Sequence, residues 1–242
     1  TIVASFNMNF SIDDRSAWVH VEALGDDSCF TALPLGFTFN GFGASTAQVS
    51  LSSNGNLFFG NLCSTTFSNN ALPILISSNA FLSFFWDDLY DYSGGEYFEY
   101  TTLGTAPGRV FNLYFRNRLL SSVCGSDPIQ VMIQIHEGSN IVNVTYLGFS
   151  GCENIRGGTA TLGLQSANGA KAVMAGFNGV MLLLTYNWVR ISGPLGVMAA
   201  VCSNWAESDP SCVTTVQPSF NRLHSRLPGF TMGSMVKVIP GR

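Results

Sequence analysis

Short runs of alternating apolar and polar residues, each closed by a turn signal, dominate this sequence. The turn signals include the pairs Asn54-Gly55, Pro107-Gly108, Asn168-Gly169 and Asn178-Gly179. An Asn-Gly pair between two alternating runs is a strong hairpin signal, and no segment shows a sustained helical period. Short strands at this spacing predict an all-β protein. We expect a jelly-roll-like β-sandwich of antiparallel strands with an extended amino-terminal strand.

Charge is sparse along the chain. Only 11% of the 242 residues are charged and 46% are apolar, with a formal net charge of −4, whereas an ordinary domain is about 25% charged. The apolar content excludes a disordered chain. The 11 Lys and Arg residues form no basic patch for nucleic acid. No apolar run reaches the roughly 18–20 residues of a transmembrane segment. So little charge favours burial of surface against copies of the same chain.

The cysteines and the first residue indicate an exported protein. Six cysteines, an even number, suit an oxidising compartment. The chain begins at Thr1 with no initiator Met, so we expect a mature form from which a signal segment was removed. The predicted location is extracellular or at the cell surface.

One predicted hairpin supports a disulfide pairing. Inward-facing apolar residues alternate on its two strands, namely Val131, Ile133 and Ile135 and then Val142, Val144 and Tyr146. Cys124 and Cys152 lie equally far from a turn centred near Gly138, so we pair them. Cys202 with Cys212 would close a small loop, which leaves Cys29 with Cys63. Other connectivities and free buried thiols remain alternatives.

A family resemblance covers residues 33 to about 178. The stretches that carry it are Leu33-Pro34-Leu35-Gly36-Phe37-Thr38-Phe39, Leu51-Ser52-Ser53-Asn54-Gly55-Asn56-Leu57 and Phe84-Phe85-Trp86-Asp87-Asp88-Leu89, followed by Gly104-Thr105-Ala106-Pro107-Gly108-Arg109. In order and spacing they resemble the nidogen-like (NIDO) extracellular domain and its secreted microbial relatives. The resemblance implies a β-rich module of matrix, adhesion or surface proteins without enzymatic activity. From the residues themselves, Asn54-Gly55 predicts a tight turn and Trp86 a core anchor.

The first twelve residues carry the strongest alternation in the chain. Every even position there is apolar: Ile2, Ala4, Phe6, Met8, Phe10 and Ile12. A strand of this length would extend about 40 Å, and chain ends are normally polar and frayed unless something holds them. Such a strand therefore needs a groove in which to bury its apolar face.

Two interpretations of this strand remain open. It could be the first edge strand of its own sandwich, or it could be donated to the sheet of the next subunit. Head-to-tail donation does not close on itself and produces a filament. Burial of six apolar side chains contributes at most on the order of 10 kcal/mol before ordering costs. The low charge favours donation, with copies of the same chain as partners.

We divide the chain into three parts on this basis. Residues 1–16 form the extension, residues 17–202 the nidogen-like β-sandwich, and residues 203–242 a disulfide-tied tail. The tail has no clear period from residue 203 to 227. Its apolar run near the end predicts either a closing strand, which we prefer, or another intersubunit arm.

Acidic residues cluster around one predicted loop. Asp87, Asp88, Asp91 and Glu96 surround a Gly-Gly pair, and carboxylates on a loop can bind Ca²⁺. The spacing is not that of an EF-hand, and the same acids could simply solvate the loop. We therefore expect no cofactor, with Ca²⁺ as the alternative. Asp26 and Asp27 indicate only a surface turn.

Two glycosylation sequons are present, at Asn9 and Asn143. Asn143 alternates with Val142 and Val144, so its side chain is expected to face outward, where a glycan could sit. His20, His136 and His224 lie in unrelated contexts without a nucleophile motif, so we expect no enzyme. The sequence predicts a structural subunit of an extracellular assembly. The alternative is a monomeric adhesion or binding module that takes a glycan or a matrix protein.

Overall fold

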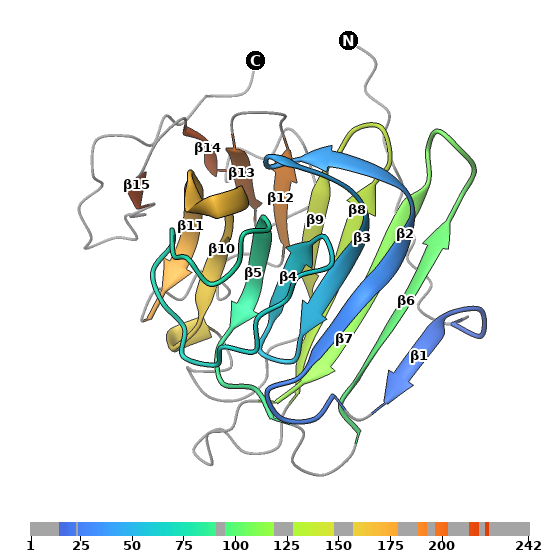
Figure 1. The fold of residues 1–242 in the computed structure, drawn as a ribbon, viewed down its shortest axis with the longest axis horizontal. Coiled ribbons are helices and arrows are strands. Elements are labelled where there is room, and N and C mark those ends of the chain that lie inside the picture. Colours follow the sequence, from blue (N-terminus) through green and yellow to red (C-terminus); the bar gives the residue numbers. More distant parts are fainter. Residues whose placement is uncertain are drawn as a thin grey trace.

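The computed structural model describes residues 15–22, 24–90, 95–118, 128–147, 157–178, 188–192, 197–202, 213–217 and 221–222. For the last four ranges only the backbone is described. These residues form two β-sheets that pack face to face, with β2, β3 and β4 in front of β7, β8 and β9 in Figure 1. The predicted β-sandwich is confirmed. No helix in the described part of the chain is long and apolar enough to cross a membrane.

The larger sheet has eight strands. In spatial order they are β1 (Val19–Glu22), β6 (Tyr97–Leu103), β7 (Val110–Asn117), β8 (Ile129–His136), β9 (Val142–Tyr146), β12 (Trp188–Ser192), β13 (Val197–Cys202) and β14 (Val213–Gln217). All neighbouring strands in this sheet are antiparallel. The short strand β1 therefore forms one edge of the sandwich.

The smaller sheet has seven strands. In spatial order they are β15 (Asn221–Arg222), β11 (Ala172–Phe177), β10 (Thr161–Gln165), β5 (Phe81–Trp86), β4 (Asn56–Phe59), β3 (Ala44–Ser52) and β2 (Cys29–Gly41). Its pairs are antiparallel except for β11 with β15, which run parallel. A short 3-10 turn (Ala167–Gly169) precedes β11.

The core lies between the sheets and follows the alternation in the sequence. In the hairpin of β8 and β9, Val131 pairs with Tyr146, Ile133 with Val144 and Ile135 with Val142. All six side chains are buried, so the predicted hairpin and its inward face are confirmed. Phenylalanines from both sheets fill the space, and Phe84 and Phe115 meet edge to face at 5.0 Å between ring centroids.

A second, smaller core lies outside the seven-stranded sheet. It contains Phe58, Leu72, Phe81, Trp86 and Ala172. Trp86 is fully buried, as expected of an anchor, but it anchors residues 60–80 to the outer surface of the sheet. Its indole Nε1–H donates to Thr66 O at 2.8 Å. Burial of both faces explains why β5 is apolar without alternation.

The carboxyl-terminal part contains strands that the sequence did not indicate. β14 lies beyond residue 202 and extends the eight-stranded sheet next to β13, and β15 joins the other sheet. Both strands fall in the stretch from residue 203 to 227 that shows no period in the sequence. The predicted amino-terminal strand lies outside the described residues, and so does the apolar run near the carboxyl terminus.

Candidate functional site

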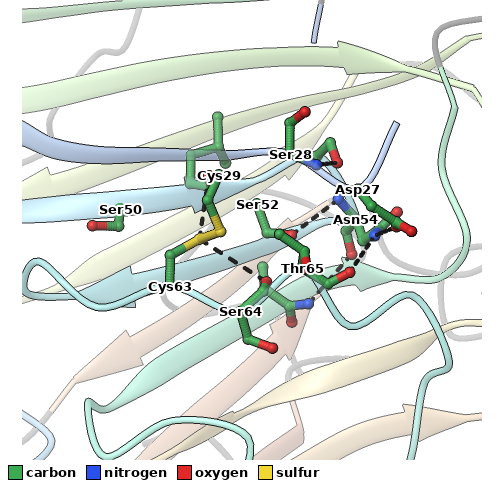
Figure 2. Close-up of a disulfide and its surroundings, with 12 residues drawn as sticks. Asp27, Ser28, Cys29, Ser50, Ser52, Asn54, Cys63, Ser64 and Thr65 are labelled. Atoms are coloured by element: carbon green, nitrogen blue, oxygen red, sulfur yellow. Dashed lines mark hydrogen bonds between the residues drawn. A yellow bond between two sulfur atoms is a disulfide. The ribbon is translucent and has the colours of Figure 1, made fainter. Parts of the chain in front are cut away.

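A disulfide fixes one end of the seven-stranded sheet. Cys29, at the start of β2, is bonded to Cys63, which follows β4, with an S–S distance of 2.03 Å (Figure 2). This is the pair that remained after the other cysteines were assigned. Cys124, Cys152 and Cys212 lie outside the described residues, as does the side chain of Cys202. The disulfide suits the oxidising environment of an exported protein.

The turn between β3 and β4 lies beside this disulfide and is built from buried polar residues. Asn54 is fully buried. Its Nδ2 donates to Asp27 Oδ1 at 2.7 Å and to Thr65 O at 3.1 Å (Figure 2). Its Oδ1 accepts from Leu89 N at 3.0 Å. One amide therefore links three loops. The sequence predicted the turn, but nothing in it marks Asn54 as the link between these loops.

Gly55 brings this turn against β5. Its carbonyl oxygen accepts from both Phe84 N and Phe85 N at 3.1 Å. Its φ is +73°, and a Cβ at this position would lie 1.9 Å from Phe85 O. Only glycine fits both the left-handed conformation and the close approach of the backbone.

Among the described residues, Asp87, Asp88 and Glu96 do not form one cluster of carboxylates. Glu96 is fully buried and paired with Arg118 at 2.7 Å. Asp87 accepts from the Thr159 hydroxyl at 2.6 Å and from Asp88 N at 2.9 Å. Asp91 lies outside the described residues. Asp87 and Glu96 therefore have structural partners, and the calcium alternative for these four acids stays a prediction.

A different trio of carboxylates is brought together. Asp26, Asp27 and Asp88 each place one carboxylate oxygen within 4.8 Å of the others. From the sequence, Asp26 and Asp27 indicated only a surface turn. Asp88 is remote from them along the chain, so their proximity to it could not be predicted. Burial raises the pKa of Asp88, and the negative charges of Asp27, Asp26 and Asp87 raise it further. Among the described acids, these three place their carboxylate oxygens close enough together to bind a divalent cation.

The chain enters the sandwich on the outer face of the eight-stranded sheet. Arg15 Nη1 contacts Glu99 Oε2 at 2.5 Å, and the Arg15 guanidinium lies 4.5 Å from the centroid of the Tyr114 ring. Glu99 and Tyr114 are paired across β6 and β7 and face away from the core residue Phe98. The predicted assembly residues Ile2, Ala4, Phe6, Met8, Phe10 and Ile12 precede this point and lie outside the described residues.

The two sequons have different outcomes. Asn9 lies outside the described residues. Asn143 lies on the face opposite to Val142 and Val144, as expected, but its side chain is only 3% exposed. Its Nδ2, the atom that would carry a glycan, is 2.9 Å from His136 Nε2. The expected exposure of Asn143 is therefore wrong, because the residue is buried.

Arg109 and Glu137 tie the ends of two hairpins together. Arg109 Nε donates to Glu137 Oε2 at 2.9 Å and Nη2 to Oε1 at 2.7 Å. The same guanidinium also donates to Gly36 O of β2. The pKa of Glu137 falls to about 2 because Arg109 donates hydrogen bonds to its carboxylate. This contact connects the eight-stranded sheet to β2.

Comparison with known proteins identifies the family. Residues 7–181 match the family described as NIDO related. The match begins well before residue 33, where the resemblance in the sequence starts, and includes part of the predicted extension. No curated protein and no solved structure is significantly similar to the chain. The family match, the β-sandwich and the disulfide agree with an extracellular type of module, and the chain belongs to the NIDO-related family.

Proposed function

We propose that this protein is a structural subunit of an extracellular filament or surface assembly. Each copy would donate residues 1–12 to the sheet of the next copy. The observation that carries the proposal is the alternation of six apolar side chains with polar ones over those residues. A strand with one continuous apolar face is stable only where that face is covered. The proposal includes no catalytic activity.

The described structure supports this proposal at the point where the extension begins. Arg15 lies on the outer face of the eight-stranded sheet, held by Glu99 and Tyr114. Only Asp13 and Asp14 separate it from Ile12, the last apolar residue of the alternation. An extension that starts from an outer face is placed to leave its own sandwich.

The experiment compares substitutions on the two faces of the predicted strand. The double variant Phe6→Asp with Phe10→Asp places charge on the apolar face. Ser5→Asp with Asn7→Asp places the same charge on the polar face of the same segment. Negative-stain micrographs and sedimentation velocity would show filaments for the unsubstituted chain and for the polar-face control, and monomers for the apolar-face variant.

Two results would overturn the proposal. One is an unsubstituted chain that stays monomeric over the concentrations tested. The other is filaments from the apolar-face variant as long as those of the control. The first result leaves the alternative function, a monomeric extracellular adhesion or ligand-binding module of the same family, as the better account.

A further inference from the structure

The edge strand β1 has an uncovered inner face. Val19 and Val21 pair with Tyr100 and Phe98 of β6, so they lie on the face of the sheet that carries the core residue Phe98. Val19 is nevertheless 49% exposed. In Figure 1, β1 lies beyond β6 at the right, and no described strand of the other sheet crosses it.

Half-buried apolar side chains continue this uncovered surface towards the core. Val21, Phe30 and Tyr100 pack against the core but are only partly buried. Phe30 of β2 meets Phe98 of β6 edge to face at 4.9 Å between ring centroids. A continuous apolar surface therefore extends from β2 across β6 to β1. One additional strand could pack against it.

The other sheet ends at β2, and the two halves of β2 differ. In the second half, side chains cap three backbone groups. The Thr102 hydroxyl donates to Leu35 O at 2.8 Å, Arg109 donates to Gly36 O, and Asn40 N donates to Asn140 Oδ1 at 2.8 Å. In the first half, from Phe30 to Pro34, the described contact of this kind is Ala32 N with Ser50 Oγ of the neighbouring β3, at 3.4 Å. The first half has about the length of an ordinary strand, with a register shift against β3 between Phe30 and Leu33.

We propose that the amino-terminal strand of a second copy binds beside the first half of β2, over the inner faces of β1 and β6. This inference rests on the proposed function and names the acceptor for the donated strand. Backbone hydrogen bonds to β2 would extend the seven-stranded sheet. The apolar even-numbered side chains would face Val19, Val21 and Tyr100, which are the side chains that the described sandwich leaves partly uncovered.

The position of Arg15 favours a second copy over the strand's own copy. Arg15 is held on the outer face of the eight-stranded sheet, whereas the acceptor surface is on the inner face. Ile12 is three residues away, and three residues span at most about 10 Å. The packed sheets alone are about 10 Å apart, so a link of this length favours a second copy as the acceptor.

Site-specific photo-cross-linking tests this placement in the full chain. Benzoylphenylalanine replaces Val19 in one variant and His20 in the matched control. His20 is the next residue on β1, and its ring contacts Glu99 on the outer face at 2.8 Å. Each variant is assembled from a mixture of isotope-labelled and unlabelled protein, so that mass spectrometry distinguishes links between copies from links within one copy.

The expected result is a link from position 19 to residues 1–12 of a differently labelled copy, with at least fivefold less from position 20. Filaments whose links from position 19 map to another segment would overturn the acceptor site and leave the proposed function standing. Links to residues 1–12 of the same copy would overturn both, and so would an unsubstituted chain that does not assemble.

A charge substitution covers the case in which the bulky probe itself prevents assembly. Val19→Lys is expected to abolish filaments without unfolding the protein, because the side chain is half exposed. His20→Lys, on the outer face, should leave filaments intact. Filaments of normal length from Val19→Lys would contradict the acceptor site, whatever the cross-linking shows.

Discussion

Asn54 and Asp27 are joined by a 2.7 Å hydrogen bond between the amide of a fully buried turn and the carboxylate of a neighbouring loop. The same amide side chain also accepts from Leu89 N. In Asn54→Ala the Leu89 N–H stays buried without its acceptor, and Asp27 loses its donor. We expect a loss of about 2–3 kcal/mol in the free energy of unfolding, measured by denaturant titration. Asn70→Ala, at an exposed loop position, is the control, and an equal loss in both variants would contradict this role of Asn54.

Alanine substitutions at Gly55 and Gly138 would distinguish the free-energy cost of a left-handed backbone from that of a steric clash. Their φ angles are +73° and +74°, but an added Cβ lies 1.9 Å from the nearest atom at Gly55 and 3.4 Å at Gly138. Gly138→Ala should cost about 1–2 kcal/mol for the left-handed conformation. Gly55→Ala should cost at least about 2 kcal/mol more, because Phe85 must move. Equal melting temperatures for the two variants would show that the turn does not lie against β5.

Glu137 should contribute stability that depends on pH. Its pKa is lowered from 4.5 to about 2 by Arg109. The contribution is therefore fully present above pH 4.5 and is lost as pH falls towards 2. Glu137→Gln should be less stable than the unsubstituted protein at pH 7, with a difference that shrinks between pH 4.5 and 2. Glu22→Gln, whose carboxylate is 83% exposed, is the control. A difference for Glu137→Gln that is constant with pH would contradict the ion pair.

Asp88 should have the opposite effect. Its pKa is raised by burial and by neighbouring carboxylates, so its ionised form opposes folding above its ordinary pKa of 3.8. Asp88→Asn should raise the melting temperature at pH 7, and the gain should disappear at acidic pH. Because no cofactor is expected, millimolar Ca²⁺ should leave the melting temperature of the unsubstituted protein unchanged. A calcium-dependent increase that Asp88→Asn abolishes would instead place a cation among the three carboxylates.

Alternation and turn signals in the sequence were sufficient to predict the sandwich and the register of the β8–β9 hairpin. The strands at Asn56–Phe59, Phe81–Trp86 and Ile129–His136 lie within short runs bounded by turn residues. β13 was not predicted, and its sequence Val-Met-Ala-Ala-Val-Cys lacks the alternation that marks Ile129–His136. β2 proved longer than its central apolar run, because edge strands tolerate the Pro34 and Gly36 that interrupt the pattern.

Contacts between distant loops account for what the sequence did not reveal. Alternation correctly assigned the face of Asn143, but it carries no information on whether that face is covered. The approach of Asp88 to Asp26 and Asp27 depends on β5 ending at the same side of the sheet at which β2 begins. Local patterns do not encode this proximity, and the same holds for the three loops that meet at Asn54.

The binding of residues 1–12 by a neighbouring copy can be measured directly with a synthetic peptide of those residues. Sedimentation velocity would follow the full chain as it assembles with increasing peptide, against a control peptide carrying Phe6→Asp and Phe10→Asp. The account predicts that the native peptide occupies the acceptor beside β2 and shortens the filaments in proportion to its concentration, while the control peptide does not. Filaments unchanged by a large excess of native peptide would contradict strand donation.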